Sequence, residues 1–358
     1  MISERRRRGP AGRVPRGFVL AITLWLLAGI AIAVALMTLW SLDQVAQARI
    51  GHERLQDEMA LAGTRDTLLY LAATRELTYA GLPTSVLAED QQAVRRLDEM
   101  GGLIRDPVGG ELSLDDTVYQ GLEGSLFSIQ DEAGLIPLAW TRSTSLDRFL
   151  LQQGIDERRL PRLRDALLDY VDADDLNRLN GAERREYRRA GRSGPPNRRL
   201  LVPREIGSVL GWEELSPGQL EAIAARITPY YAGALNLNTV PHDLLPLWLA
   251  DCPAACDRLL EMRRQASFRS LRDVQGRSGA LLGDDAGDYR FVADETLRLT
   301  LWSRTGAAWR IHVRLTPLAD RRGPWSILAS YPIARPDNDE PAEETGSVLF
   351  ADPAADRH

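Results

Sequence analysis

The most constraining feature of the sequence is an uncharged run from Phe18 to Leu42. At about 1.5 Å per residue, about 20 apolar residues in a helix already cross a hydrocarbon core roughly 30 Å thick. Six arginines and one glutamate stand in residues 1–17, directly before the run. Because basic residues stay in the cytoplasm, the sequence predicts a single-pass inner-membrane helix over 18–42, with a cytoplasmic N-terminus and a periplasmic C-terminal domain.

Two other interpretations of this run stay open. Ala46 and Ala48 form an Ala-x-Ala site, which would suit a cleaved secretory signal, although the run is longer than the usual apolar core of such signals. A plain signal anchor, with no processing and a periplasmic domain behind it, is the simplest alternative.

The remaining composition is that of ordinary globular protein. The 358 residues are 44% hydrophobic and 26% charged, which is enough for two domains with cores of their own. All 44 basic residues are arginine, and the formal net charge is −6. The leader 1–17 has a formal charge of +5, so the rest of the chain is acidic and opposes nucleic-acid binding.

A helical pattern continues beyond the membrane segment. Gly81 and Pro83 end a helix of about 60 residues that starts at Phe18, too long for a globular core and typical of a stalk. The face expected to be apolar after the membrane segment consists of Leu55, Met59, Ala62, Leu69 and Ala73.

Strand patterns flank a helical middle. Alternating, β-branched or aromatic segments occur at 117–138, 296–305, 307–317 and 325–332. Helical spacing occurs at 146–153, 159–173, 216–231, 241–250 and 255–265, with a loop at 186–205. The predicted fold class is α+β, in which a large α-helical domain is inserted into a small α/β domain behind the long transmembrane helix.

The predicted boundaries follow from these patterns. They comprise a basic leader 1–17, an N-terminal helix 18–80 with its transmembrane part at 18–42, an α/β domain made of 84–138 and 289–334, an inserted α-helical domain 139–288, and a disordered tail 335–358.

The junction VPRGFVLAITLWLL resembles the processing site of type IV prepilins. The resemblance implies a pilin-like α/β domain, cleavage by a prepilin peptidase between Gly17 and Phe18, and N-methylation of Phe18. The retained helix would then serve as anchor and as assembly core. Most such proteins carry a glutamate five residues into the mature helix, where this chain has Ile22. An unpaired terminal charge is costly to bury, so Ile22 suits a subunit with nothing above it.

A second resemblance lies in the middle of the chain. The phrases DEAGLIPL, DALLDYVDADD, NGAERREY, IGSVLGW, ALNLNTVPHDLLPLWL and SFRSLRDV occur in this order. They resemble the minor pseudopilin K family of type II secretion, also called general secretion pathway protein K, over most of residues 13–316. Members of this family typically lack the helix glutamate, which agrees with Ile22. Pro137 stands where the family wording has an asparagine, so that turn is expected to differ.

This resemblance implies a structural role in an assembly and no catalytic activity. Proteins of the family initiate and cap a periplasmic pseudopilus that pushes exoproteins through the outer membrane. The implied partners are minor pseudopilins I and J, the major pseudopilin, the secretion platform, the prepilin peptidase and the inner membrane. Neither nucleic acid nor a small-molecule substrate is expected.

A run of carboxylates in the middle domain predicts a calcium site. The candidate ligands, all within 18 residues, are Asp169, Asp172, Asp174, Asp175, Glu183 and Glu186. Hard oxygen ligands at this density suit calcium, and the family resemblance also implies calcium here. Leu176 excludes an EF-hand, because it occupies the third ligand position of a frame that starts at Asp172. The alternative is a solvated acidic helix end whose side chains cap helices or pair with nearby arginines.

Cys252 and Cys256 are the only cysteines. A periplasmic location permits a disulfide, and a pair four residues apart can meet the distance limit if the segment is helical. Two buried thiols remain the alternative.

Catalysis is not expected. The sequence has no phosphate-binding GxxxxGK[ST] loop, no GxSxG nucleophile motif, and no second histidine to complete HExxH after His52. Asp131 and Glu132 are adjacent, and in a strand they would point to opposite faces.

Nucleic-acid binding is the rival from another functional class. Residues 235–274 also resemble the helix-hairpin-helix segments of DNA-uptake receptors, which would make the chain a membrane-anchored nucleic-acid-binding protein. Such hairpins bind phosphate through backbone amides between glycines. The segment LADCPAAC has no glycine, and Pro253 removes one amide donor.

Overall fold

A computed structural model describes residues 17–85, 105–138, 145–282, 286–316, 323–333 and 348–350. The chain divides into two compact units, residues 1–56 and residues 57–358. The predicted leader lies outside the described residues apart from Gly17.

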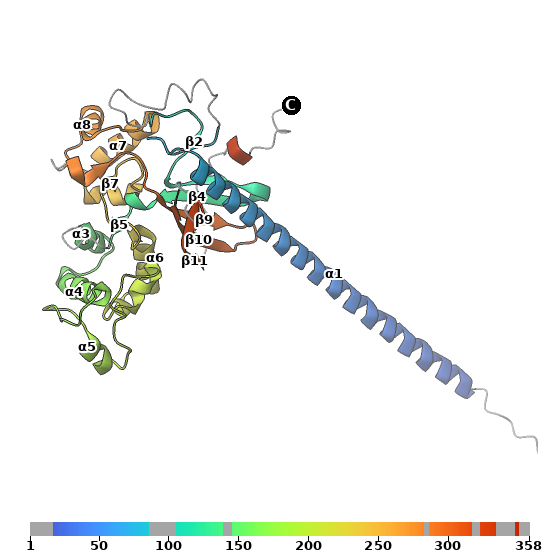
Figure 1. The fold of residues 1–358 in the computed structure, drawn as a ribbon. Coiled ribbons are helices and arrows are strands. Elements are labelled where there is room, and N and C mark those ends of the chain that lie inside the picture. The colour runs from blue at the N-terminus through green and yellow to red at the C-terminus, as the bar shows by residue number, and fades with distance from the viewer. Residues whose placement is uncertain are drawn as a thin grey trace, which may run out of the picture. The chain divides into compact units, whose positions relative to one another are not determined.

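Helix α1 runs from Gly17 to Thr74 without a break (Figure 1). Its side chains from 18 to 50 are exposed, and an 18-residue window reaches a mean hydropathy of 2.7, so the helix is long and apolar enough to cross a membrane. The helix ends before Gly81, because the chain turns after Thr74 and pairs Thr78 with Gly81 in a β-bridge.

The buried stripe of α1 differs from the predicted one. Leu55 and Met59 are exposed at 54% and 67%. The buried positions start at Asp57 and include the predicted Leu69; together they are Asp57, Ala60, Leu61, Thr64, Leu68, Leu69, Leu71 and Ala72. The prediction was wrong at Leu55 and Met59 because Asp57 and Thr64 interrupt the apolar pattern. Asp57 accepts a hydrogen bond from the Thr305 amide (3.0 Å), and Thr64 accepts one from the Leu122 amide (3.0 Å).

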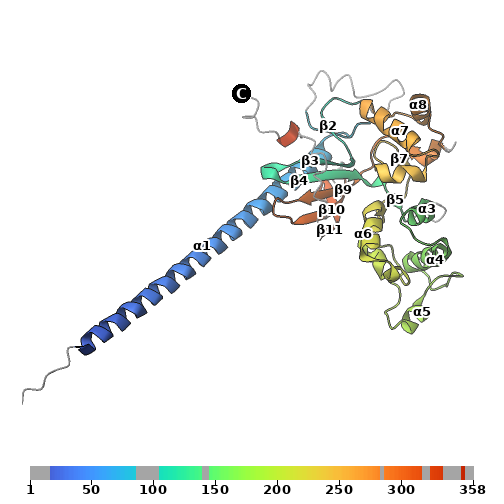
Figure 2. The same ribbon diagram turned by 180° about the vertical axis from the view of Figure 1, so that it is seen from behind.

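Five antiparallel strands form the main sheet, in the order β11-β10-β9-β4-β3. Both ribbon views show β4, β9, β10 and β11 side by side (Figures 1 and 2). Their bounds are Asp115–Gln120 (β3), Leu126–Asp131 (β4), Thr296–Trp302 (β9), Ala308–Leu315 (β10) and Trp325–Pro332 (β11). Each predicted strand segment contains at least one of these strands.

The two faces of this sheet have opposite polarity. Phe127 opposite Leu301, and Ile129 opposite Leu299, belong to the core that also contains the buried stripe of α1. The intervening positions are polar: Ser128 opposite Thr300 and Gln130 opposite Arg298. These four side chains are also buried. A buried polar face requires hydrogen-bond partners from another part of the chain.

The middle of the chain is helical. Its α-helices are Ser145–Gln152 (α3), Leu160–Val171 (α4), Arg184–Arg189 (α5), Pro217–Arg226 (α6), Ala254–Gln265 (α7) and Leu271–Ser278 (α8). Its 3-10 turns are η3 Glu157–Arg159, η4 Pro203–Ser208, η5 Trp212–Glu214, η6 His242–Leu247 and η7 Ala286–Asp288. They enclose a second core around Phe149, Leu163, Tyr187, Trp212 and Phe268, separate from the core of the sheet and α1.

Short strand pairs connect distant segments. β1 (Leu82–Pro83) pairs with β2 (Glu111–Leu112), β5 (Ile136–Pro137) with β6 (Ile227–Thr228), and β7 (Leu235–Asn236) with β8 (Tyr289–Arg290). The last two pairs are parallel, and they tie both ends of the helical region to the chain around it.

Three predicted elements take another form. The segment 241–250 is the 3-10 turn η6 rather than an α-helix, because Pro246 lies inside it and cannot donate an amide. The predicted loop 186–205 contains the end of α5 and the start of η4. In the predicted disordered tail, Val348–Phe350 form the turn η8, and Phe350 packs on Phe127. The rest of the tail lies outside the described residues.

Candidate functional site

The motif DEAG (131–134), at the end of β4, forms hydrogen bonds with the motif LNLNT (235–239), which follows β6. Asp131 is fully buried and accepts hydrogen bonds from Asn236 Nδ2 (2.8 Å), Thr239 Oγ1 (2.9 Å), and the amides of Ala133 and Asp294 (3.1 Å each). Burial raises the pKa of Asp131 to about 6, although these four donors oppose the rise. Asp131 therefore joins the sheet to the two segments that enclose α7 and α8.

Gly134 and Asn238 complete this junction. A Cβ on Gly134 would lie 2.4 Å from the Thr239 carbonyl oxygen, so only glycine fits the approach. Asn238 donates to the carbonyls of Phe268 and Phe291 (2.8 Å each) and accepts from the Phe268 amide (2.9 Å). The phrases DEAGLIPL, ALNLNTV and SFRS, far apart in the sequence, are thus hydrogen-bonded parts of one structural joint.

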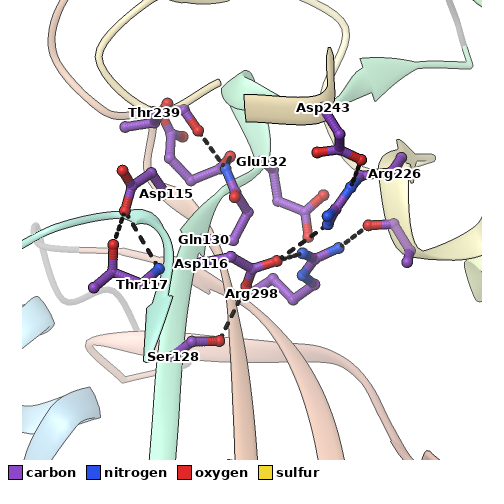
Figure 3. A network of polar contacts seen from close by, with 12 residues as sticks. Asp115, Asp116, Thr117, Ser128, Gln130, Glu132, Arg226, Thr239, Asp243 and Arg298 are labelled. Atoms are coloured by element: carbon purple, nitrogen blue, oxygen red, sulfur yellow. Dashed lines mark hydrogen bonds and ion pairs between the residues drawn. The ribbon is translucent and has the colours of Figure 1, made fainter. Parts of the chain in front are cut away.

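The polar face of the sheet extends this joint. Figure 3 shows Asp116 between Ser128, Arg226 and Arg298, with Asp243 beside Arg226. Burial alone would raise the pKa of Asp116, but the guanidinium groups of Arg298 and Arg226 bring it below its ordinary value. Arg298, itself fully buried, also donates to the Ala225 carbonyl at the end of α6 (2.6 Å).

The strand patterns did not predict a buried pair on the same face. His312 Nδ1 lies 2.6 Å from Glu132 Oε1, and His312 Nε2 lies 2.9 Å from the Tyr331 hydroxyl. Burial lowers the pKa of His312 even though Glu132 opposes this. The available signal was Arg298, Arg310 and His312 at alternating positions of apolar strands, which marks a polar face but does not show that it is buried.

The predicted calcium ligands do not meet at one point. Among the residues that the structure describes, no group of three Asp, Glu, His or Cys side chains has the arrangement of a metal site. Asp169 and Asp172 both bind Arg178, Asp169 with an Nη1–Oδ1 distance of 2.6 Å. A Cβ on Gly181 would clash with Asp169 at 1.9 Å, so Gly181 allows this close packing.

The other acidic residues of the run have separate roles. Asp174 accepts from the Leu176 amide (2.8 Å), Asp175 pairs with Arg184 (3.2 Å), and Glu186 pairs with Arg185 (2.9 Å). These contacts are the helix-end and surface interactions expected of a solvated acidic helix end.

Glu183 differs from its neighbours. It is 4% exposed, and neither carboxylate oxygen has a hydrogen-bond partner among the described residues. Burial, followed by the charges of Asp169, Asp172 and Asp175, raises the pKa of Glu183 to about 7. Asp172 Oδ1 is buried and unpartnered in the same way. A divalent cation would supply the positive charge that these oxygens lack, and carboxylate oxygens are ligands that calcium prefers.

Cys252 and Cys256 form a disulfide, with Cα atoms 5.2 Å apart. The bond spans the entry into α7, and Cys256 is buried in the helical core. The segment 235–274, which resembles a helix-hairpin-helix, contains β7, η6, α7 and the first half of α8, and Pro253 precedes the first turn of α7.

The predicted processing site lies at the start of α1. Gly17 is the first helical residue, and Phe18 and Ile22 are 68% and 44% exposed.

Comparisons with known proteins agree with one another. The family model of type II secretion system protein K matches residues 138–228. The type II secretion system protein K of Dickeya chrysanthemi is 28% identical over 142 residues, which span 37% of this chain and 37% of that protein. A chain in the crystal structure of the GspK–GspI–GspJ complex from the enterotoxigenic Escherichia coli type 2 secretion system shares the fold with a TM-score of 0.53. That match has 12% identity and covers 82% of this chain and 99% of that chain.

The matched region 138–228 includes α3 to α6, which form much of the helical core, and the shared fold extends to most of the chain. The middle of the chain is therefore similar to type II secretion system protein K, and the solved structure shows a shared fold.

Proposed function

We propose that the protein is a minor pseudopilin of the type II secretion system. It would help to initiate the periplasmic pseudopilus and form its tip, and so serve protein export across the outer membrane. The observation that carries this proposal is the match of residues 138–228 to the protein K family.

The long helix supplies the means of assembly. The first part of α1 exposes apolar side chains over its whole circumference, which suits lipid first and neighbouring apolar helices later. Ile22 adds no carboxylate to this surface, as expected of a subunit at the tip. The proposed partners are minor pseudopilins I and J, with the major pseudopilin and the secretion platform below them.

Processing belongs to the same proposal. A prepilin peptidase would cut between Gly17 and Phe18 and methylate Phe18, which removes the arginine-rich leader and keeps the anchor. The leader arginines support an N-terminus in the cytoplasm and a C-terminal domain in the periplasm of an inner-membrane protein. The protein would do structural work and catalyse no reaction.

A calcium ion would strengthen the helical region. We propose that Glu183 and Asp172, together with Asp174 or Asp175, hold the ion. Bound calcium would neutralise their mutual repulsion and fix the segment between α4 and α5. Isothermal titration of the protein with calcium should give heat that Glu183→Gln abolishes, and silence at ~1 mM calcium would remove this part of the proposal.

Co-purification tests the main proposal. The chain, expressed with minor pseudopilins I and J and the prepilin peptidase, should be recovered as a complex with both. Recovery of the correctly folded and processed chain without either partner would contradict the proposed role.

A further inference from the structure

Strand β11 forms one edge of the main sheet, at the lower end of the sheet in Figure 2. Its inner side pairs with β10, and no strand among the described residues pairs with its outer side. Edge strands usually carry charged side chains that prevent pairing with another chain. The β11 segment WSILASYP has no charged residue, and a bulge at Leu328 and the terminal Pro332 are its only such guards. This edge is therefore open to a further strand.

Hydrogen bonds at both ends of the β10–β11 pair show which backbone groups of β11 point outward. The Thr316 amide donates to the Pro324 carbonyl (2.8 Å), and the Ile333 amide donates to the Ala308 carbonyl (3.0 Å). In an antiparallel pair every second residue bonds to the neighbouring strand, and the bulge shifts this alternation by one residue. The residues whose amide and carbonyl point away from β10 are therefore Trp325, Ile327 and Ser330.

These outward groups lack partners. Their amides and carbonyls form no hydrogen bond within the described part of the chain. The Pro332 carbonyl, the next outward group, accepts a hydrogen bond from Arg204 Nη1 (3.1 Å). The helical region thus satisfies the end of the edge, and the backbone groups over 325–330 remain for solvent or for another chain.

Apolar side chains line one face of this edge. Ile327 is opposite the core residue Val313, so it lies on the face of the sheet that packs on α1, and yet it is 54% exposed. Trp309, four residues before Val313 on β10, lies on the same face and is 42% exposed. A strand added to β11 would remove apolar surface from water here.

Arginines line the opposite face. Arg310 and Arg314 alternate with the core residues of β10. Arg310 Nε is buried without a partner in the described part of the chain, and Arg314 donates to a backbone carbonyl (3.3 Å). The acids whose charges act on Arg310 are Asp116 and Glu221, and both are paired with other arginines. A strand added to β11 would lie about 10 Å from β10, within the reach of an arginine side chain.

We propose that β11 pairs with an extended segment of a minor pseudopilin partner, which adds a strand to the main sheet. The inference rests on the proposed function, which supplies the partner. The outward groups over 325–330 would bond to the partner's backbone, as in other cases of strand addition. The partner segment would alternate apolar side chains, which cover Ile327, with acidic ones, which meet Arg310 and Arg314. A second copy of this chain fits less well, because the arginines of both copies would lie on the same face.

Hydrogen exchange at single amides tests this edge. The full chain, produced with the prepilin peptidase and purified alone or with minor pseudopilins I and J, is analysed by mass spectrometry with fragmentation to single residues. In the chain alone, exchange should be fast at the outward amides of Trp325, Ile327 and Ser330. It should be slow at the amides that face β10, those of Ser326, Ala329 and Tyr331. In the complex the outward amides should also exchange slowly.

Matched variants test the same contact through assembly. Ile327→Lys places a charge on the exposed edge and should abolish recovery of the complex. Leu281→Lys, at a leucine 79% exposed in the helical region, is the control and should preserve it. Ser330→Pro removes only an outward amide and should also reduce recovery. The exchange measurement uses the unaltered chain and so does not depend on how the variants fold.

The outcomes separate this inference from the proposed function. Fast exchange at the outward amides in the complex, or full recovery of the complex with Ile327→Lys, would overturn the inference and leave the proposed function in place. Slow exchange that appears without partners and increases with the concentration of the chain would assign the edge to a second copy, and so would also overturn it. Recovery of the unaltered, folded chain without either partner would contradict both.

Discussion

At the scale of single residues, Glu183 has the most informative environment. Its buried carboxylate has no hydrogen-bond partner among the described residues, and burial with the neighbouring aspartates raises its pKa to about 7. The folded state therefore binds this proton more tightly than the unfolded state, whose pKa is the ordinary 4.5. Between these two values the free energy of unfolding falls as the pH rises, and above pH 7 the cost of the charge is complete.

Glu183→Gln is expected to raise the free energy of unfolding at pH 8, without calcium, by on the order of 2 kcal/mol. At pH 5 the difference should be small, because Glu183 is then already neutral. Urea unfolding in a calcium chelator at pH 5 and pH 8 measures both values. Glu157→Gln, at an exposed position, is the control and should change neither. An equal effect of Glu183→Gln at the two pH values would contradict this account.

Gly134 tests the joint between the sheet and the helical region. Gly134→Ala should lower the free energy of unfolding by roughly 1–3 kcal/mol, because the new Cβ meets the Thr239 carbonyl, which belongs to a hydrogen-bonded backbone. Gly276→Ala is the matched control: the site lies inside α8 with no atom near the added Cβ, and alanine should stabilise it by about 0.5–1 kcal/mol. Thermal unfolding of both variants decides, and a stable Gly134→Ala would show that the joint is loose.

At the scale of elements, the disulfide ties the entry of α7 to its first turn. A loop this short constrains the unfolded chain only modestly, so Cys252→Ala/Cys256→Ala should cost about 2 kcal/mol. The intact mass should rise by two hydrogens on reduction. An unchanged mass after complete reduction would mean that the cysteines are free thiols.

Elements with an unbroken pattern could be predicted from the sequence. WSILASYP is strand β11, and the Ser216 cap, with Pro217 at the first helical position, starts α6 where the spacing places it. Elements whose pattern contains polar residues could not be predicted in this way. The stripe of α1 includes Asp57 and Thr64, which are buried only because Thr305 and Leu122, far along the chain, supply their partners.

At the scale of the whole molecule, the mature N-terminus decides between anchor types. Mass spectrometry of the chain produced with a prepilin peptidase should find N-methylated Phe18 as the first residue. Assembly requires the apolar helix to survive processing without the arginine-rich leader, whose charges would be costly among packed helices. A mature chain that begins at Arg49, or an untrimmed chain that begins at Met1, would contradict assembly through α1.

Local periodicity and length were enough to predict the apolar helix, the α+β class and the strands on either side of a helical middle. The order of short phrases also indicated the protein K family. The role of those phrases is visible only in the fold. Asp131, Gly134 and Asn238 form a joint because backbone groups from β4, from the segment after β6 and from residues 268 and 291 meet there.

The acidic run 169–186 likewise could not be interpreted from the sequence alone. Its composition indicated a cation site, but only the fold separates Asp169 and Asp172, which bind Arg178, from Glu183, which has no partner among the described residues. Burial and pairing depend on how the segment between α4 and α5 folds back on α4, so that burial and the charges of Asp169 and Asp172 raise the pKa of Glu183.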